Sequence, residues 1–302
     1  MELKSNIFEI DAAAYIERLC GFIRESRSTL NRDGILVPFS GGLDSSTVLL
    51  LCVRAVGKDH VTALLMPEDQ GNPEAADYAQ IVLEKYQVAS MIRDITPILS
   101  SLGTYNFILS KLRFRPIQNR AVQAYMKLSG KNPFLQVIQG TATEMERSGY
   151  AKFMSKQRVR VVVEYLVAEE MNYLVAGCAH RSEDLVGLFV KFGADDIADI
   201  MPLKNLYRSH IVQLARRLGV PDEILNRTPN PDIIPGVSDK YVDILGLPCD
   251  IIDLVLYGLE HRMDTELIAE QLGLPAKRIL EIRKLVEQTE HMRNHSRSLT
   301  WD

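Results

Sequence analysis

One short stretch, from Val37 to Thr47, constrains the fold of this chain more than any other. It reads V-P-F-S-G-G-L-D-S-S-T. The run 34–39 that leads into it is short, apolar and bounded by turn formers, as expected of a buried parallel strand. Residues 45–53 open with hydroxyl residues that favour a helix start and continue with apolar ones, which is typical of a core helix. The stretch therefore predicts a strand, a turn over Ser40–Ser45 and a helix.

The turn over Ser40–Ser45 has the composition of an anion-binding loop. Gly41 and Gly42 carry no side chains, so a ligand can approach the backbone closely, and the N–H groups at the helix start favour an anion. A carboxylate at Asp44 repels a phosphate unless a cation lies between them. The loop thus indicates a polyphosphate bound with magnesium. The alternative is that the Gly-Gly pair only makes a tight turn.

Strand-like and helix-like segments alternate along the first two thirds of the chain. Strands are expected at 60–66, 89–95 and 173–177, and helices at 8–31, 45–57, 73–87 and 157–170. This alternation predicts an α/β fold with a doubly wound parallel sheet flanked by helices. Ligands of such sheets bind beyond the carboxyl ends of the strands, where the turn over 40–45 and the segment 177–183 fall. After residue 203 the pattern is mainly helical, and we expect a single domain over 1–302.

The composition is that of a globular protein rather than a membrane protein. Apolar residues make up 46% and charged residues 25% of the chain, and both values are ordinary. No apolar run approaches the ~20 residues of a membrane span, and no apolar signal core follows the N-terminus. The four cysteines lie far apart without a C-x-x-C pair. We therefore expect reduced thiols, a cytoplasmic location and no zinc site.

The net charge of −4 hides a strongly basic segment. Residues 104–160 hold eleven Lys or Arg against two Glu. The basic residues include Lys111, Arg113, Arg115, Arg120, Lys127 and Lys131, near Phe114 and Tyr125. Such a segment could bind an anionic partner, either a dinucleotide or RNA. It could equally be a solvated helical face or a dimer contact.

The hexapeptide S-G-G-L-D-S resembles the pyrophosphatase loop of the ATP-cleaving enzymes that include NAD synthetase, GMP synthetase and asparagine synthetase. The Walker pattern G-x-x-x-x-G-K-[ST] is absent. Later landmarks resemble the ammonia-dependent NAD synthetases in the same order: G-x-x-x-K-[YF]-G at Gly187–Gly193, the M-P-L run at 201–203 and T-E-H-M-R at 289–293. The resemblance covers roughly 8–98 and 155–295, and implies an adenine nucleotide α hydrolase-like, Rossmann-like fold with a helical C-terminal part.

The resemblance implies an amidation in two steps, carried out by a carbon–nitrogen ligase. ATP adenylates the carboxylate of deamido-NAD (nicotinic acid adenine dinucleotide) and releases pyrophosphate, and ammonia then displaces AMP to give NAD. It also implies a homodimer. Because only about 33 residues precede the first strand, we expect no fused glutaminase domain, so that ammonia itself or a separate glutaminase supplies the nitrogen.

The resemblance also implies roles for individual residues. Pro38, Phe39, Ser40, Gly41, Gly42, Leu43, Asp44 and Ser45 would embrace the ATP phosphates, with Cys178 and Arg208 as further ATP contacts. Asp44 and Glu183 would hold Mg2+. Arg158, Lys191, Asp199 and His291 would bind deamido-NAD, and Asp44 and Lys191 would be catalytic. Lys191 and Arg158 can neutralise phosphate or carboxylate charge.

Several departures concern the acceptor rather than the ATP chemistry. Met154 stands where the family has Asn, Lys240 replaces an acidic residue, and Met292 replaces a Lys. The basic insertion at about 104–153 matches no family segment. Loss of amide and cationic groups changes recognition of an anionic acceptor. Two alternatives therefore stay open: an ATP-dependent amide ligase for another carboxylate, and an adenylating tRNA-modifying enzyme, although nucleic acid is the less expected partner.

Overall fold

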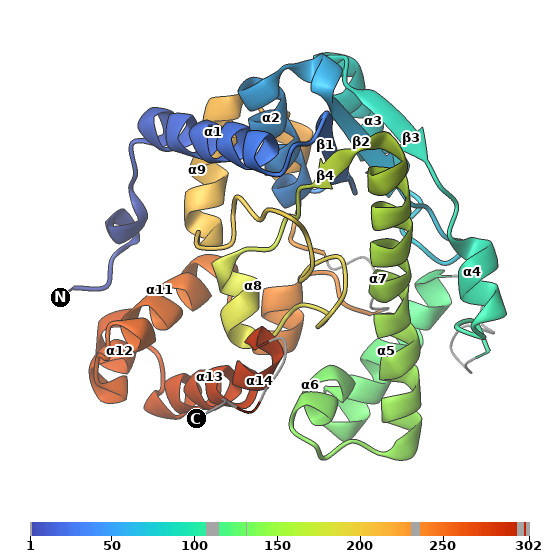
Figure 1. The fold of residues 1–302 in the computed structure, drawn as a ribbon. Helices are drawn as coiled ribbons and strands as arrows, with labels where there is room; N and C mark the ends of the chain where they lie inside the picture. The colour runs from blue at the N-terminus through green and yellow to red at the C-terminus, as the bar shows by residue number, and fades with distance from the viewer. Residues whose placement is uncertain (1, 107–114, 131, 231–235, 295–298, 300–302) are drawn as a thin grey trace.

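The computed structural model describes residues 2–106, 115–130, 132–230, 236–294 and 299. Its centre is a four-stranded parallel sheet in the order β3-β2-β1-β4 (Figure 1). The strands are β1 (Gly34–Pro38), β2 (Val61–Leu65), β3 (Ala89–Ile92) and β4 (Tyr173–Val175). In the register of the sheet, Ile35 lies between Val61 and Leu174. The α/β fold with a doubly wound parallel sheet, predicted from the alternation of segments, is confirmed.

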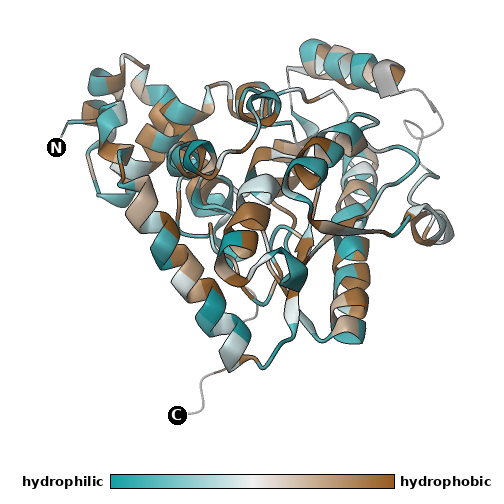
Figure 2. Cartoon of the chain, turned by 90° about the horizontal axis from the view of Figure 1, so that it is seen from above, coloured by the Kyte–Doolittle hydropathy of each residue, from teal (hydrophilic) through white to brown (hydrophobic). Residues whose placement is uncertain are grey.

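Helices cover both faces of this sheet. On one face lie α1 (Ala12–Thr29), α2 (Leu43–Val56), α3 (Ala75–Tyr86) and α9 (Arg208–Leu218), and on the other α4 (Thr96–Ser101) and α7 (Glu144–Met171). Because successive side chains of a strand point to opposite faces, Ile35 and Val37 belong to the first core and Leu36 to the second. All three are fully buried. The outer helices carry both hydrophilic and hydrophobic residues, as expected of helices that cover a core (Figure 2).

Another hydrophobic core, separate from the cores of the sheet, packs the C-terminal helices together. It contains Phe8, Tyr241, Ile252 and Val255, and it confirms the predicted helical C-terminal part. The elements around it are η1 (Ser5–Phe8), α8 (Arg181–Val186), η3 (Tyr241–Leu245), α11 (Cys249–Glu260), α12 (Thr265–Leu272), α13 (Ala276–Gln288) and α14 (Glu290–Arg293). The remaining elements are η2 (Lys58–His60), α5 (Arg115–Ser129), α6 (Pro133–Ile138) and α10 (Asp222–Leu225).

Several helix boundaries differ from the sequence prediction. Helix α7 begins at Glu144 instead of 157, because Thr143 and Glu146 form a reciprocal capping box at its start. Helix α2 begins at Leu43, so Asp44 lies in its first turn and not in the preceding loop. Near the C-terminus, where the sequence predicts a mainly helical pattern, α13 and α14 are divided at Thr289, whose hydroxyl donates to the Leu285 carbonyl at 2.8 Å.

The described part of the basic segment is mainly helical, and several of its cations are used within the chain. Arg147 donates to the Ala142 carbonyl at 2.6 Å, and Lys152 donates to the Asn106 carbonyl at 2.9 Å. Lys156 forms a buried ion pair with Glu68 at 2.5 Å. Of the basic segment's other residues, Arg120 and Lys127 are exposed. The described residues do not include Lys111, Arg113, Phe114, Lys131 or the side chain of Arg115. Among the helices that the structure describes, none has the length and apolar character needed to cross a membrane.

Candidate functional site

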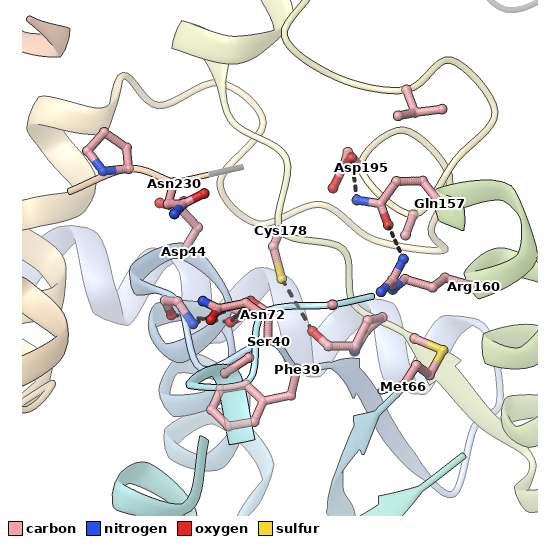
Figure 3. A pocket seen from close by; sticks show the side chains of 18 of the residues that line it. Phe39, Ser40, Asp44, Met66, Asn72, Gln157, Arg160, Cys178, Asp195 and Asn230 are labelled. Carbon is pink, nitrogen blue, oxygen red and sulfur yellow. Dashed lines mark hydrogen bonds between the residues drawn. The ribbon is translucent and has the colours of Figure 1, made fainter. Parts of the chain in front are cut away.

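A cavity of about 530 Å³ opens beyond the carboxyl ends of β1, β2 and β4. Figure 3 shows its two ends, with Ser40, Asp44 and Asn230 at one and Gln157, Arg160 and Asp195 at the other. Cys178 lies between the two groups in this view. This is where the topology of a parallel α/β sheet places a ligand. The end formed by Ser40–Ser45, Glu183, Arg208 and Lys240, together with His180 buried behind it, is called the loop end below.

The predicted loop has the geometry of a tight strand-to-helix turn. Gly41 has a φ of +72°, and a Cβ atom there would lie 2.6 Å from the backbone nitrogen of Ala79, so only glycine fits. Gly42 caps α2 and its N–H donates to the Ser40 hydroxyl oxygen at 3.3 Å. The Ser40 and Ser45 hydroxyl oxygens lie 3.2 Å apart. Pro38, Phe39, Ser40, Gly42, Leu43, Asp44 and Ser45 all line the cavity.

Asp44 is paired with Arg208, the first residue of α9. One guanidinium nitrogen of Arg208 donates to both carboxylate oxygens, at 3.0 and 3.1 Å. Burial alone would raise the pKa of Asp44, but the lowering contributions of the groups around it, with the charge of Arg208 the largest of them, together outweigh burial and the pKa is lowered. Asp44 is therefore a carboxylate at neutral pH, and the two residues predicted to contact ATP from distant parts of the sequence lie together.

Glu183 lies in the first turn of α8 and is paired with the ammonium group of Lys240. His180 is fully buried beside both acids, with its Nε2 atom 3.9 Å from an Asp44 oxygen and 3.6 Å from a Glu183 oxygen. Burial lowers the pKa of His180 to about 3, so its ring is neutral. Neither of its ring nitrogens has a hydrogen-bond partner among the residues that the structure describes.

These three side chains fit a divalent metal ion. Asp44, His180 and Glu183 each offer one ligand atom, and these atoms all lie within 4.8 Å of one another. Two carboxylate oxygens suit Mg2+, which keeps several of its own water molecules. Such water molecules donate hydrogen bonds, and the neutral, unpartnered imidazole of His180 can accept one. The sequence prediction named Asp44 and Glu183 but missed His180, although it precedes Glu183 by three residues, one helical turn.

A buried network fixes the starts of α8 and α9, which carry Glu183 and Arg208. The Ser182 hydroxyl donates to Asp253 of α11 at 2.5 Å and accepts from the Arg208 backbone N–H at 2.9 Å. The other oxygen of Asp253 accepts from the Ser209 N–H and hydroxyl at 2.9 and 2.6 Å. Sequence reasoning did not anticipate this support, because the three segments are far apart in the chain.

The opposite end of the cavity is formed by α7 and the loop after Gly193. Gln157 donates to Asp195 at 2.9 Å and accepts from Arg160 at 3.2 Å. Glu164 is fully buried in the cavity wall, and neither carboxyl oxygen has a partner among the described residues. Burial raises the pKa of Glu164 to about 8, so it is protonated near neutral pH. Sequence analysis missed these residues, although Arg160 and Glu164 share one face of the helix.

Three residues predicted to bind the acceptor form what we call the C-terminal cluster: Arg158, Lys191 and His291. Arg158 donates through Nε and Nη2 to the Lys191 carbonyl, both at 3.3 Å. The Lys191 ammonium donates to the carbonyls of His291 and Asn294 at 2.6 and 2.7 Å. None of the three lines the cavity, although Gln157 and Val190, each one residue away in the sequence, do.

The other two predicted contacts lie differently. Cys178 lines the cavity, with its sulfur 4.0 Å from the Pro38 carbonyl, and burial raises its thiol pKa well above the usual range. A neutral thiol there is a contact surface and not a nucleophile. Asp199 is not part of the cavity lining, and its carboxylate accepts from the Val175 N–H at 2.7 Å and from Tyr165 at 3.3 Å. All four cysteines are free thiols.

Comparisons with known proteins show which sequences and folds this chain is similar to. The protein-family model described as NAD synthase matches residues 15–127 and 119–296. A protein from Thermotoga maritima named NH(3)-dependent NAD(+) synthetase is 35% identical over 279 residues, covering 92% of this chain and 96% of that protein. Two solved structures share the fold. An NMN synthetase from Francisella tularensis has a TM-score of 0.70 at 22% identity, and an NH3-dependent NAD synthetase from Campylobacter jejuni has 0.67 at 21%. Each alignment covers 97% of this chain and 100% of the solved one.

The parallel sheet, the glycine turn and the acidic pair beside it define a nucleotide-binding α/β ligase. The length and identity of the matches identify it further: the chain belongs to the NAD synthase family. The resemblance seen in the sequence is thereby confirmed.

Proposed function

We propose that the protein amidates deamido-NAD to NAD with ammonia at the expense of ATP, through an acyl-adenylate and with release of AMP and pyrophosphate. The observation that carries this proposal is the coincidence of two findings. Relatives of that activity match nearly the whole chain, and the loop end of the cavity gathers Asp44, Glu183 and Arg208 around a glycine turn. A carboxylate is a poor acyl donor, and adenylation gives it a good leaving group.

At the loop end, the chain's own groups would position the triphosphate. The backbone of Ser40–Ser45 and the start of α2 face the phosphates, because that is where unpaired N–H groups of a helix lie. Arg208 would move from Asp44 to the phosphates as charge develops on the departing pyrophosphate. Cys178 would pack against the nucleotide without reacting.

Magnesium, when bound, would neutralise phosphate charge and favour pyrophosphate as a leaving group. We propose Asp44 and Glu183 as its ligands, with neutral His180 accepting a hydrogen bond from a metal-bound water. The buried nitrogens of His180 support this arrangement, since they have no partner in the part of the chain that the structure describes and a buried polar atom is costly unless something satisfies it.

We propose the C-terminal cluster as part of the acceptor site. Arg158 and Lys191 would neutralise the diphosphate or carboxylate of deamido-NAD, with Lys191 close to the reacting group, and His291 would contact the substrate through its ring. Asp199 already accepts hydrogen bonds from the Val175 N–H and from Tyr165, so a bond from the acceptor would have to be added to these. Its present partners favour a structural role over direct contact.

The protein is proposed to act as a cytoplasmic homodimer that takes ammonia from solution or from a separate glutaminase. An exposed apolar pair on α7 supports the dimer, since Val162 and Leu166 are 68% and 57% exposed and lie one turn apart. Arg158 is one turn before Val162, so the same helix face leads to the acceptor cluster.

The decisive experiment follows products with purified protein, ATP, magnesium and an ammonium salt, with and without deamido-NAD. Formation of NAD together with equal amounts of AMP and pyrophosphate is the expected result. ADP and orthophosphate as products, or AMP formation independent of any acid, would contradict the proposed reaction.

A second arm replaces deamido-NAD with the acid whose amide is NMN. The fold relative named NMN synthetase makes this competitor informative, and Met154 and Met292 are the departures that would alter acceptor choice. A higher kcat/KM for the mononucleotide would mean that the proposed reaction is right but that its substrate is the mononucleotide and not deamido-NAD.

A further inference from the structure

Both acidic residues of the proposed metal site are already paired with buried cations. Arg208 holds Asp44, and Lys240 holds Glu183. The side chains of Lys240 and Glu183 are only 11% and 12% exposed. Lys240 is also one of the positions at which the sequence departs from the family pattern that it resembles.

Backbone hydrogen bonds hold Lys240 in place, and its side chain, 11% exposed, ends at the ion pair with Glu183. Its N–H donates to the Pro229 carbonyl at 3.0 Å. The carboxylate of Asp239 caps the next two N–H groups, and Tyr241 is fully buried beside it. The anchor fixes the Cα position, whereas the four-carbon stem of a lysine can place its ammonium group at several points within reach.

The Lys240 ammonium and a divalent cation cannot both occupy the side of Glu183. Two cations within a few ångströms repel each other strongly in a buried site. If the metal displaces Lys240, a buried ammonium loses its counter-ion, which is costly. A polyphosphate entering the same cavity removes that cost, because it brings new anionic oxygens within reach of Lys240, which lines the cavity.

We propose that Lys240 is a positioning residue that makes binding of the metal and of the triphosphate interdependent. Without nucleotide its ammonium occupies Glu183 and excludes the metal. With nucleotide it moves to the phosphates and leaves Glu183 to the metal. This inference rests on the proposed function of the loop end. It adds that the coupling between the two ligands resides in one side chain.

The test measures metal binding without nucleotide as well as nucleotide binding. Mn2+ affinity is measured by electron paramagnetic resonance with protein alone, and Mg-ATP affinity by titration calorimetry. Lys240→Met is expected to bind Mn2+ alone at least about tenfold more tightly than the unaltered protein and Mg-ATP at least about tenfold more weakly, since one charge contact of this kind is worth about a factor of ten or more.

Lys204→Met is the matched control. Lys204 pairs with Asp184, the neighbour of Glu183 on α8, at 2.6 Å. Removing it deletes a cation at a similar place without freeing Glu183, so both affinities should change less than about twofold, as for a partly exposed pair. If Lys240→Met does not fold, Lys240→Gln carries the same expectations, because it also removes the charge.

The outcomes separate the two proposals. If Mg-ATP binds the unaltered protein but neither Lys240 variant changes the Mn2+ affinity, the coupling role is wrong and the proposed function stands. If both Lys240 variants bind Mn2+ tightly and Mg-ATP as well as the unaltered protein does, Lys240 only blocks the metal and the coupling role is again wrong. If the unaltered protein binds no Mg-ATP, the proposed function of the loop end falls first, and the inference falls with it.

Discussion

The loop end of the cavity and the C-terminal cluster use similar charged residues in different ways. At the loop end, Asp44 and Glu183 are half-buried beside cations and pair with them side chain to side chain. In the C-terminal cluster, Arg158 and Lys191 donate to backbone carbonyls of other segments. In the first arrangement, the side chains of the fold pair with one another. In the second, the cations have no carboxylate partner among these contacts, and the proposed anionic substrate would supply one.

The largest effect should follow from Asp44→Asn, which tests the loop end. The amide keeps the shape of the side chain but removes the charge that would hold a metal, so kcat should fall on the order of a hundredfold or more. Steady-state formation of AMP and NAD measures it, and circular dichroism checks the fold. Activity within a few-fold of the unaltered protein would contradict the metal assignment.

Lys191→Ala tests the C-terminal cluster in the same assay. Loss of one charge-assisted contact to the acceptor should raise KM for deamido-NAD by about tenfold. KM for ATP should stay within about twofold. This split separates the two regions, and an equal rise in both KM values would mean that the regions do not act independently.

Leu166→Glu asks whether the acceptor region depends on a second copy of the chain. A buried charge at the α7 face should weaken self-association by about tenfold or more and raise KM for deamido-NAD less than Lys191→Ala does. Analytical ultracentrifugation measures the association. Leu280→Glu on α13 is the control, since Leu280 is 47% exposed and Leu166 57%. Dimers unaffected by Leu166→Glu would remove α7 from the interface.

The same contrast explains what could be predicted from sequence. The strand, turn and helix around Gly41 are encoded locally, so this unit followed from adjacent residues, although the helix begins at Leu43 and includes Asp44. The later landmarks, including Glu183, Lys191 and His291, came from the family resemblance. The order of these landmarks in the sequence does not show which of their side chains are in contact in the folded protein.

Contacts between distant segments were not predictable. Lys240 was noticed only as a reversed charge, and its pairing with Glu183 depends on how the 236–246 segment packs against α8. His180 could have been found from its spacing to Glu183, because residues three apart share a helix face. Glu164 could have been found from its one-turn spacing to Arg160. Nothing in the pattern showed that this face of α7 closes a cavity.

The smallest predicted effect is a change in the pH dependence of stability caused by Glu164, a residue of the cavity wall. Its pKa is raised from 4.5 to about 8 by burial. Between these values the unfolded chain loses this proton and the folded one keeps it, so this carboxyl lowers stability as pH rises. Glu164→Gln removes that dependence.

The melting temperature of the variant relative to the unaltered protein should therefore increase from pH 5 to pH 8, by about 2 °C or more. Glu169→Gln, on the exposed side of α7, is the control and should show no such trend. A difference that does not vary with pH would mean that Glu164 ionises normally, through a contact that ligand or water supplies in solution.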